Sequence, residues 1–178
     1  TNLTVTVIVM KAIIESLKEF PNFNASYDQE RNELIFKQYY HLAVAVDTEA
    51  GLIVPVIRDV DQKSVFDLSV ELGEIAQKAR DRALGVEDLQ GGTFTISNLG
   101  GLGVSHFTPI INTPDLEILG MSRAKNIVQI IDGKPENRLM MPMSLSYDHR
   151  VIDGADGARF MRHLIDNIQH FSEKAIKI

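Results

Sequence analysis

The sequence contains no cysteine among its 178 residues. This absence excludes disulfide bonds, cysteine nucleophiles and thiolate metal sites within the chain. Positive charge is also sparse, because 18 basic residues are outweighed by 24 acidic residues and no long basic run occurs. A protein that follows a phosphate backbone needs concentrated positive charge, so we expect no nucleic-acid partner.

Long apolar runs are missing as well. The run over residues 5–10 stops at Lys11, far short of the roughly 20 residues that cross a bilayer, so we expect no membrane span. The start also lacks the charged region and the cleavage site of a secretory signal. Because residue 1 falls inside an apparent secondary-structure element, we interpret the chain as a fragment that forms one domain around one core.

Three common motifs are absent. No Gly-x-Ser-x-Gly sequence marks the nucleophile of an α/β-hydrolase. The five histidines include no His-Glu-x-x-His pair, so the sequence gives little support for a zinc site. The glycines of segment 100–103 are not followed by Gly-Lys-Ser/Thr, which favours a tight turn over a phosphate-binding loop.

Hydrophobic periodicity predicts three helices and seven strands. The helices are expected over residues 3–20, 64–84 and 155–171, although β-branched residues near the start also favour a strand. Ser64 is the expected cap of the second helix. The strands are expected over residues 33–37, 41–47, 52–57, 93–97, 117–122, 127–131 and 139–147. Because strands outnumber helices and occur in runs, the pattern predicts an α+β fold with a mixed, largely antiparallel sheet, and Pro55 predicts an edge or a bulge.

Segment 144–160 places a histidine, three carboxylates and two arginines between an apolar strand and an amphipathic helix. Histidine titrates near neutral pH, which makes His149 the leading candidate for a general base. The alternative is a structural or solvated histidine, and the latter is what we expect of His163 and His170. Asp153 stands before Gly-Ala, where it has the position of a simple helix cap.

This segment, Ser-Leu-Ser-Tyr-Asp-His-Arg-Val-Ile-Asp-Gly-Ala-Asp-Gly-Ala-Arg-Phe, resembles the active-site signature of the dihydrolipoamide acyltransferases, the core subunits of the 2-oxo acid dehydrogenase complexes. Four further segments resemble the family in the same order; they are residues 20–26, 51–57, 91–100 and 109–112. The resemblance implies the fold of chloramphenicol acetyltransferase, an α/β two-layer sandwich that assembles as a homotrimer. It also implies active sites at subunit interfaces, in a channel that coenzyme A and lipoamide enter from opposite ends.

The resemblance implies three catalytic positions. His149 would take the proton of the coenzyme A thiol, and the Ser97 hydroxyl would donate to the oxyanion of the tetrahedral intermediate. Asp153 would support the site by fixing the geometry of the loop and an arginine. Without the family, Ser97 is an ordinary serine at a strand end. If the family's interface geometry holds, Ser97 of one subunit serves His149 of its neighbour, and an isolated monomer is nearly inactive.

The family also implies ligands and partners. Coenzyme A or acetyl-CoA is a substrate, the lipoyl group comes from a separate domain, and no metal is expected. Arg123 and Lys125 are candidates for contacts with the coenzyme A phosphates, with plain surface charge as the alternative. The trimer is expected to build a larger cubic or icosahedral core. That core would be served by lipoyl domains, and by decarboxylase and dihydrolipoamide dehydrogenase subunits through domains absent here, in a bacterial cytoplasm or a mitochondrial matrix.

The chain also departs from the family. The family's N-terminal arm is missing before Thr1 and no Asp-Lys-Ala lipoylation motif occurs, so residues 1–178 are interpreted as an N-terminally truncated catalytic domain without a lipoyl or subunit-binding domain. Glu117 stands where the family usually has a small residue, and we expect it at a rim or in a pair. The motifs are most similar to the acetyl-transferring, pyruvate-complex branch.

Alternative functions remain open at this point. They are succinyl or branched-chain specificity, a non-catalytic core scaffold, and a free-standing acetyltransferase with a hydroxylated acceptor. Retention of His149, Ser97 and Asp153 favours the enzyme over the scaffold, because scaffolds tend to lose the histidine, and the free-standing acetyltransferase is the least favoured of the three.

Overall fold

The computed structural model describes residues 3–171 of the chain. Its centre is a five-stranded sheet in the order β11–β8–β7–β3–β6. These strands are β3 (Leu42–Val44), β6 (Val56–Ile57), β7 (Phe94–Asn98), β8 (Glu117–Met121) and β11 (Met143–Tyr147). β7 is parallel to both of its neighbours, whereas the two edge strands pair antiparallel. The predicted α+β class with a mixed sheet is confirmed.

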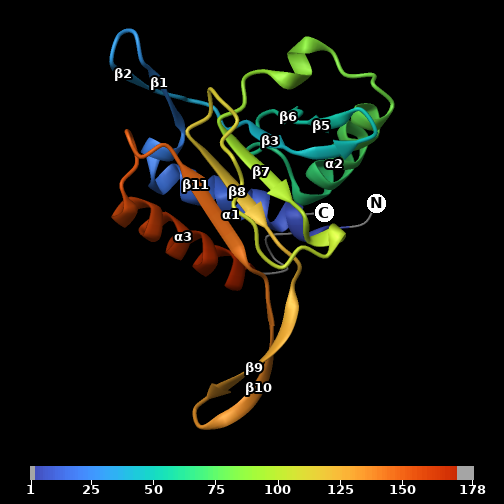
Figure 1. The fold of residues 1–178 in the computed structure, drawn as a ribbon, viewed down its shortest axis with the longest axis vertical. Coiled ribbons are helices and arrows are strands. Elements are labelled where there is room, and N and C mark those ends of the chain that lie inside the picture. The colour runs from blue at the N-terminus through green and yellow to red at the C-terminus, as the bar shows by residue number, and fades with distance from the viewer. Residues whose placement is uncertain (1–2, 172–178) are drawn as a thin grey trace.

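Three helices pack around one hydrophobic core with this sheet (Figure 1). They are α1 (Val5–Glu19), α2 (Val65–Arg80) and α3 (Gly154–Gln169). α1 contacts both other helices. Within the described residues, no helix is long and apolar enough to cross a membrane.

Three separate hairpins flank the main sheet, and each pairs antiparallel. They are β1 (Ala25–Asp28) with β2 (Glu33–Phe36), β4 (Val46–Thr48) with β5 (Gly51–Ile53), and β9 (Lys125–Ile131) with β10 (Lys134–Met140). The β9–β10 hairpin projects well away from the rest of the molecule (Figure 1). Short 3-10 turns cover Pro21–Phe23, Val86–Leu89 and Gly100–Leu102.

α1 resolves the conflict between strand and helix at the start of the chain. β-branched residues lose only a few tenths of a kcal/mol in a helix, whereas full burial of an aliphatic side chain contributes about 1.5–3 kcal/mol. The helix buries nine residues, including Val7, Val9 and Ile13. Packing therefore outweighs local propensity here.

The boundaries of the second helix follow from its capping. Ser64 accepts a hydrogen bond from the Asp67 N–H, and the Asp67 side chain accepts one from the Ser64 N–H, which completes a capping box. The helix stops at Arg80, four residues before the predicted end, and Arg82 then adopts a left-handed φ of 55°. The predicted cap is confirmed and the predicted end is wrong.

Proline and loop geometry divide several predicted strands. Residues 52–57 split into β5 and β6 around Pro55, which has no N–H to donate to a ladder, and β6 becomes a sheet edge as predicted. Residues 139–147 split at Pro142, and residues 41–47 split between Val44 and Val46. The periodicity did not reveal β1, because its four residues carry little hydrophobic pattern.

Glu117 is neither at a rim nor paired, so both expectations for this residue are wrong. It opens β8 with no exposed surface, and neither carboxyl oxygen has a hydrogen-bond partner among the described residues. Burial, followed by the charge of Asp115, raises the pKa of Glu117 well above 4.5. A buried carboxyl without partners is far less costly when neutral.

Candidate active site

His149 lies in a tight turn that connects β11 to α3. The carbonyl oxygen of Asp148 accepts hydrogen bonds from the N–H groups of Val151 (3.1 Å) and Ile152 (3.0 Å). The Asp148 N–H donates to the Leu116 carbonyl at 2.7 Å, which anchors the turn to the strand next to β11. The His149 side chain is exposed, and its ring centroid lies 5.8 Å from that of Tyr147. The imidazole is therefore accessible to a ligand or to another subunit.

Asp153 caps the helix that follows this turn. Its Oδ1 accepts a hydrogen bond from the Asp156 N–H at 2.9 Å, and its backbone is extended. The pKa of Asp153 is lowered, first by that backbone hydrogen bond and to a smaller extent by the charge of Arg159. Of the two arginines in this segment, Arg150 pairs with Asp148 and Arg159 pairs with Asp156.

Ser97 lies on β7 and faces away from the helices. Its neighbour Ile96 belongs to the hydrophobic core, and successive side chains of a strand point to opposite faces. Thr95 is on the Ser97 side, and its hydroxyl donates to the Asp115 carboxylate. Ser97 is half-buried and makes no side-chain hydrogen bond within residues 3–171. Its hydroxyl is thus free to meet a ligand on the open face of the sheet.

The strand register keeps Ser97 and His149 of one chain apart. Ser97 pairs with Gly120, and Gly120 pairs with Ser144, three residues before the end of β11 at Tyr147. At about 3.3 Å per residue and about 4.8 Å per strand, the Cα atoms of Ser97 and Tyr147 are roughly 14 Å apart, and His149 follows Tyr147. The two residues therefore lie at opposite ends of the sheet, as two candidate half-sites.

Arg123 and Lys125 lie at the same end of the sheet as Ser97. Both follow β8, whose last residue Met121 pairs with Asn98. Both side chains are exposed, and the Lys125 Nζ donates to the Ser105 hydroxyl at 2.6 Å. Arg123 also lines a cavity of about 430 Å³ with Asn98, Gly100 and Gly101. The structure brings two positive charges to this end of the sheet, whereas Asp153 accompanies His149 at the other end.

Comparison with known proteins decides the family. The model of the 2-oxoacid dehydrogenases acyltransferase family (catalytic domain) matches residues 1–176. The chain belongs to this family.

Relatives of this acyltransferase domain are known in sequence and structure. The dihydrolipoyllysine-residue acetyltransferase components of the pyruvate dehydrogenase complexes of Haemophilus influenzae and Azotobacter vinelandii are 49% and 52% identical over 91% and 92% of the chain. The chain spans only 29% and 26% of the length of those two proteins.

Solved structures agree in fold. Azotobacter vinelandii dihydrolipoamide acetyltransferase matches with a TM-score of 0.92 at 48% identity, over 98% of this chain and 72% of that one. A cubic core of the pyruvate dehydrogenase multienzyme complex matches with a TM-score of 0.93 at 48% identity, over 99% and 72%. Chloramphenicol acetyltransferase matches at 17% identity with a TM-score of 0.59, over 93% and 78%. The predicted chloramphenicol acetyltransferase-like fold is confirmed.

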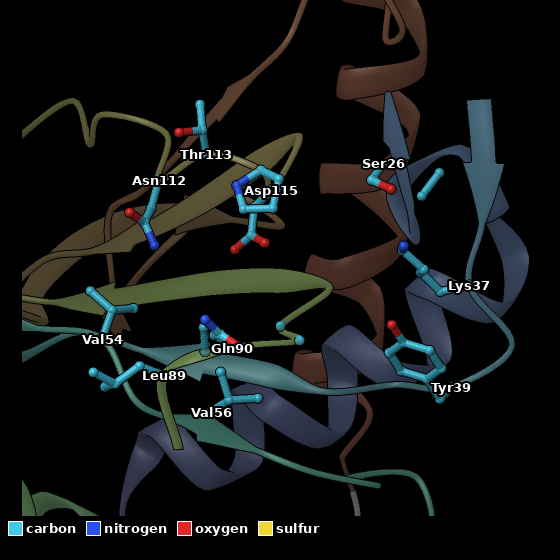
Figure 2. A pocket seen from close by; sticks show the side chains of 15 residues that line it. Ser26, Lys37, Tyr39, Val54, Val56, Leu89, Gln90, Asn112, Thr113 and Asp115 are labelled. Atoms are coloured by element: carbon cyan, nitrogen blue, oxygen red, sulfur yellow. The ribbon is translucent and has the colours of Figure 1, made fainter. Parts of the chain in front are cut away.

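The acyltransferase domain also has a cavity of about 480 Å³ that the sequence did not reveal (Figure 2). Lys37, Tyr39, Gln90 and Asn112 line it together with Asp115. Burial raises the pKa of Asp115, and the hydrogen bond from Thr95 partly offsets this rise. Because Thr95 and Ser97 share a face, the cavity opens on the same side of the sheet as Ser97. Asp115 is a single aspartate before a strand and belongs to no recognised motif, so the cavity could not be predicted from the sequence.

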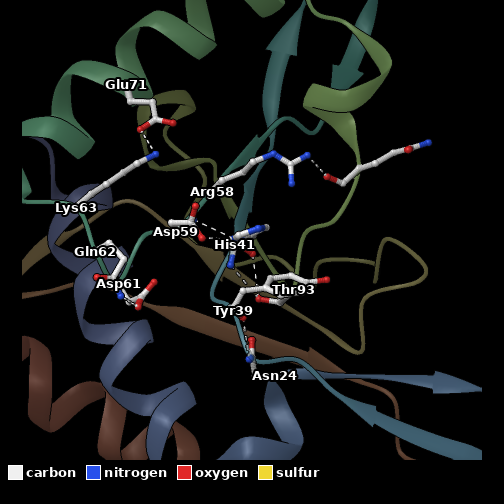
Figure 3. Close-up of polar contacts among 11 residues, drawn as sticks. Asn24, Tyr39, His41, Arg58, Asp59, Asp61, Gln62, Lys63, Glu71 and Thr93 are labelled. Atoms are coloured by element: carbon white, nitrogen blue, oxygen red, sulfur yellow. Dashed lines mark hydrogen bonds and ion pairs between the residues drawn. The ribbon is translucent and has the colours of Figure 1, made fainter.

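Two of the four other histidines of the domain, His41 and His163, are structural. His41 is buried, and its Nδ1 accepts a hydrogen bond from the Asp59 N–H at 3.0 Å (Figure 3). His163 is partly buried between α1 and α3, with its Nδ1 3.1 Å from the Ser16 hydroxyl. The prediction that His163 is solvated is therefore wrong, whereas His170 is exposed as predicted. Within the described part of the chain, no group of acidic and histidine residues has the arrangement of a metal site.

Proposed function

We propose that this domain transfers an acetyl group between dihydrolipoamide and coenzyme A, as the core acetyltransferase of a pyruvate dehydrogenase complex. The observation that carries the proposal is the pair of half-sites on the acyltransferase fold. An exposed histidine turn stands at one end of the sheet, and a serine hydroxyl without an internal partner stands at the other end. Relatives named as acetyltransferases of that complex, at about half sequence identity, support the acetyl specificity.

The spacing of the three proposed catalytic residues supports their roles. In the solved Azotobacter vinelandii enzyme, a serine, a histidine and an asparagine are named for their role in the catalytic mechanism. There the histidine lies 52 positions after the serine, and the asparagine lies four positions after the histidine. Ser97, His149 and Asp153 have the same two spacings. The one chemical difference is the carboxylate of Asp153 in place of an amide.

His149 is the proposed general base. A thiol has a pKa of about 8.5, so little of coenzyme A is thiolate at neutral pH. The imidazole takes the thiol proton as sulfur attacks the thioester carbon of acetyl-dihydrolipoamide. The carbonyl oxygen then becomes an oxyanion. When the intermediate collapses, the carbon–sulfur bond to dihydrolipoamide breaks and the imidazolium returns its proton to the departing sulfur.

Ser97 is the proposed oxyanion donor. Its hydroxyl has no competing side-chain partner within residues 3–171, so it can donate to the negative oxygen without first breaking another bond. Loss of such a donor commonly lowers kcat about 100-fold or more. Asp153 keeps a supporting role through the capping hydrogen bond, which fixes where the turn ends and α3 begins.

Assembly is part of the proposal because the register keeps the Cα atoms of Ser97 and Tyr147 roughly 14 Å apart and puts His149 at the opposite end of the sheet from Ser97. We assign Ser97 of one subunit to His149 of the next subunit, in a homotrimer that forms a larger core. The β9–β10 hairpin supports this assignment, since Val128, Ile130 and Leu139 are each about two-thirds exposed or more. The relative solved as a cubic core adds further support.

The ligands follow from the same proposal. Arg123 and Lys125 are assigned to the coenzyme A phosphates, because both are exposed cations beside the Ser97 half-site. The lipoyl group is assigned to a separate domain, and the domain's own chemistry needs no metal. The decarboxylase and dihydrolipoamide dehydrogenase are the expected partners of the whole complex.

The test compares acetyl, succinyl and isobutyryl transfer from coenzyme A to dihydrolipoamide, in the wild type and in His149→Ala and Ser97→Ala. We expect acetyl transfer to be fastest, to disappear in the histidine variant and to fall about 100-fold or more in the serine variant. Faster succinyl or isobutyryl transfer would move the assignment to another branch. An unchanged rate in His149→Ala would contradict the mechanism, and no transfer by the assembled wild type would favour a scaffold.

A further inference from the structure

The turn that carries His149 is attached to a hairpin more than 100 residues earlier in the chain. Arg150 makes this connection. Its guanidinium lies over the ring of Tyr27, with 4.9 Å from Cζ to the ring centroid. Its Nη1 also lies 3.4 Å from Oε1 of Gln29. Tyr27 is on β1 and Gln29 begins the connection to β2, so one arginine joins the β1–β2 hairpin to the turn.

Arg150 also binds the carboxylate of Asp148, the first residue of the turn. Nε of Arg150 donates to both carboxylate oxygens of Asp148 at 3.0 and 3.1 Å, and Nη2 donates at 2.6 Å. The Arg150 N–H adds a fourth bond, to Asp148 Oδ1 at 3.0 Å. These hydrogen bonds from the Arg150 side chain are the main reason that the pKa of Asp148 is lowered. His149 is the residue between these two partners, so its backbone is enclosed by their contacts.

The hairpin is ordered enough to serve as a support. The Tyr27 hydroxyl donates to Asn32 Oδ1 at 2.6 Å, which ties the two ends of the connection together. Asp28 Oδ1 accepts from the N–H groups of Glu30 and Arg31, each at 3.0 Å. Tyr27 itself is partly buried and packs against the hydrophobic core. The ring below Arg150 is therefore fixed on one side by the core and on the other by the hairpin.

We infer that Tyr27 and Arg150 form a brace that positions His149, so that the β1–β2 hairpin sets the geometry of the proposed base. This inference rests on the proposed function. Arg150 and Tyr27 are positioning residues, since neither is assigned a contact with the reacting atoms. An exposed ion pair alone adds little stability, but a cation over an aromatic face adds orientation as well as attraction. A base displaced by about 1 Å can lose a large part of its catalytic effect.

The competing role for Arg150 is recognition of an anion, because its side chain is 57% exposed. The two roles differ in what they change. An arginine that binds the phosphates of coenzyme A sets the KM for acetyl-CoA, whereas a brace sets kcat. The aromatic partner separates them further, since removal of the Tyr27 ring leaves the arginine charge in place.

The experiment measures kcat and KM for acetyl-CoA in the assembled protein with Tyr27→Leu, Tyr27→Phe, Arg150→Lys and the double variant Tyr27→Leu/Arg150→Lys. We expect Tyr27→Leu and Arg150→Lys each to lower kcat about 10-fold with little change in KM. Tyr27→Phe keeps the ring and should retain most of the rate. Because the two residues act as one unit, the double variant should be no slower than the slower single variant.

Arg31→Lys is the matched control, because Arg31 is an exposed arginine of the β1–β2 hairpin that lies near Asp28 and outside the turn of His149. Hydrogen exchange of the Ile152 amide, whose hydrogen bond closes the turn, gives a readout independent of turnover. It should quicken in Tyr27→Leu and stay unchanged in Arg31→Lys. A normal kcat in folded Tyr27→Leu, or a raised KM with normal kcat in Arg150→Lys, would overturn the brace. No transfer by the wild type would instead overturn the proposed function.

Discussion

At the scale of single residues, the proposed chemistry depends on how differently three side chains are surrounded. His149 is exposed in a turn, which leaves its imidazole free to exchange protons with a substrate. Ser97 is half-buried on a sheet face, where the strand fixes its position. Glu117 is entirely buried and has no partner among the described residues. Solvent access therefore supports the proposed proton transfer by the histidine and argues against such a role for the glutamate.

Glu117 makes stability depend on pH with a definite sign. Its pKa is raised well above 4.5 by burial, so the folded state holds its proton at pH values where the unfolded state has released it. Stability is thus lost as pH rises above about 4.5, by up to ~1.4 kcal/mol per pH unit for one proton. Glu117→Gln removes this dependence. We expect the variant to exceed the wild type in free energy of unfolding at pH 8, with the difference shrinking towards pH 4.5.

Urea unfolding at pH 5 and pH 8 measures this difference. Glu30→Gln is the matched control, because Glu30 is exposed on the β1–β2 connection. The control should change stability by less than about 0.5 kcal/mol at both pH values. An equal effect of Glu117→Gln at pH 5 and pH 8 would show that Glu117 keeps an ordinary pKa.

At the scale of elements, helices and strands with a local residue pattern could be predicted from the sequence. Elements defined by contacts between residues far apart in the chain could not. The amphipathic stripe and the Ser64 cap identified α2, because a capping box needs only residues within one turn. β1 escaped prediction because a four-residue strand in a separate hairpin is defined by its partner β2. The burial of Glu117 was not predictable either, since it depends on β11 and the helices covering the start of β8.

In the proposed active site, too, the residue types follow from a local motif, whereas their arrangement depends on contacts between distant parts of the chain. A motif indicates His149, Ser97 and Asp153 as residue types at fixed spacing. Their separation into two half-sites depends on the order β11–β8–β7, which joins strands far apart in the chain. The contact of Arg150 with Tyr27 likewise joins residues more than 100 positions apart. Long-range pairing of this kind leaves no local signal in a single sequence.

The two faces of the β9–β10 hairpin differ in charge. The apolar face carries Val128, Ile130, Pro135 and Leu139 and no charged residue, whereas the opposite face mixes Glu136 and Arg138 with Gln129, Ile127 and Met140. A two-stranded hairpin is only marginally stable in water by itself, so the apolar face is expected to be covered by another subunit. Ile130→Asp should therefore dissociate the assembly and lower transfer activity about 10-fold or more, because an unpaired charge in an interface is costly.

Analytical ultracentrifugation with circular dichroism tests this prediction. Gln129→Asp puts the same charge on the opposite face of the hairpin and serves as the control. We expect unchanged secondary structure in both variants and a smaller particle in Ile130→Asp alone. A wild-type mass in Ile130→Asp would place the subunit interface elsewhere.

At the scale of the whole molecule, the fold separates the two halves of its own proposed active site. The parallel step from β7 to β8 and the antiparallel step from β8 to β11 put the last residue of β7 and the last residue of β11 at opposite ends of the strands of one sheet. In the proposed trimer, each subunit would supply a base to one neighbour and an oxyanion donor to the other. In a closed ring, every subunit interface then contains one complete site.

The most direct test of this composite site mixes two inactive variants. His149→Ala subunits and Ser97→Ala subunits are unfolded together in equal amounts, refolded and assayed for acetyl transfer to dihydrolipoamide. In random trimers about one quarter of the interfaces join an intact Ser97 to an intact His149, so about one quarter of the wild-type rate should return. Variants refolded separately and then combined should stay inactive. If co-refolding restores no activity although mass measurements show mixed trimers, both residues act within one subunit and the composite site is contradicted.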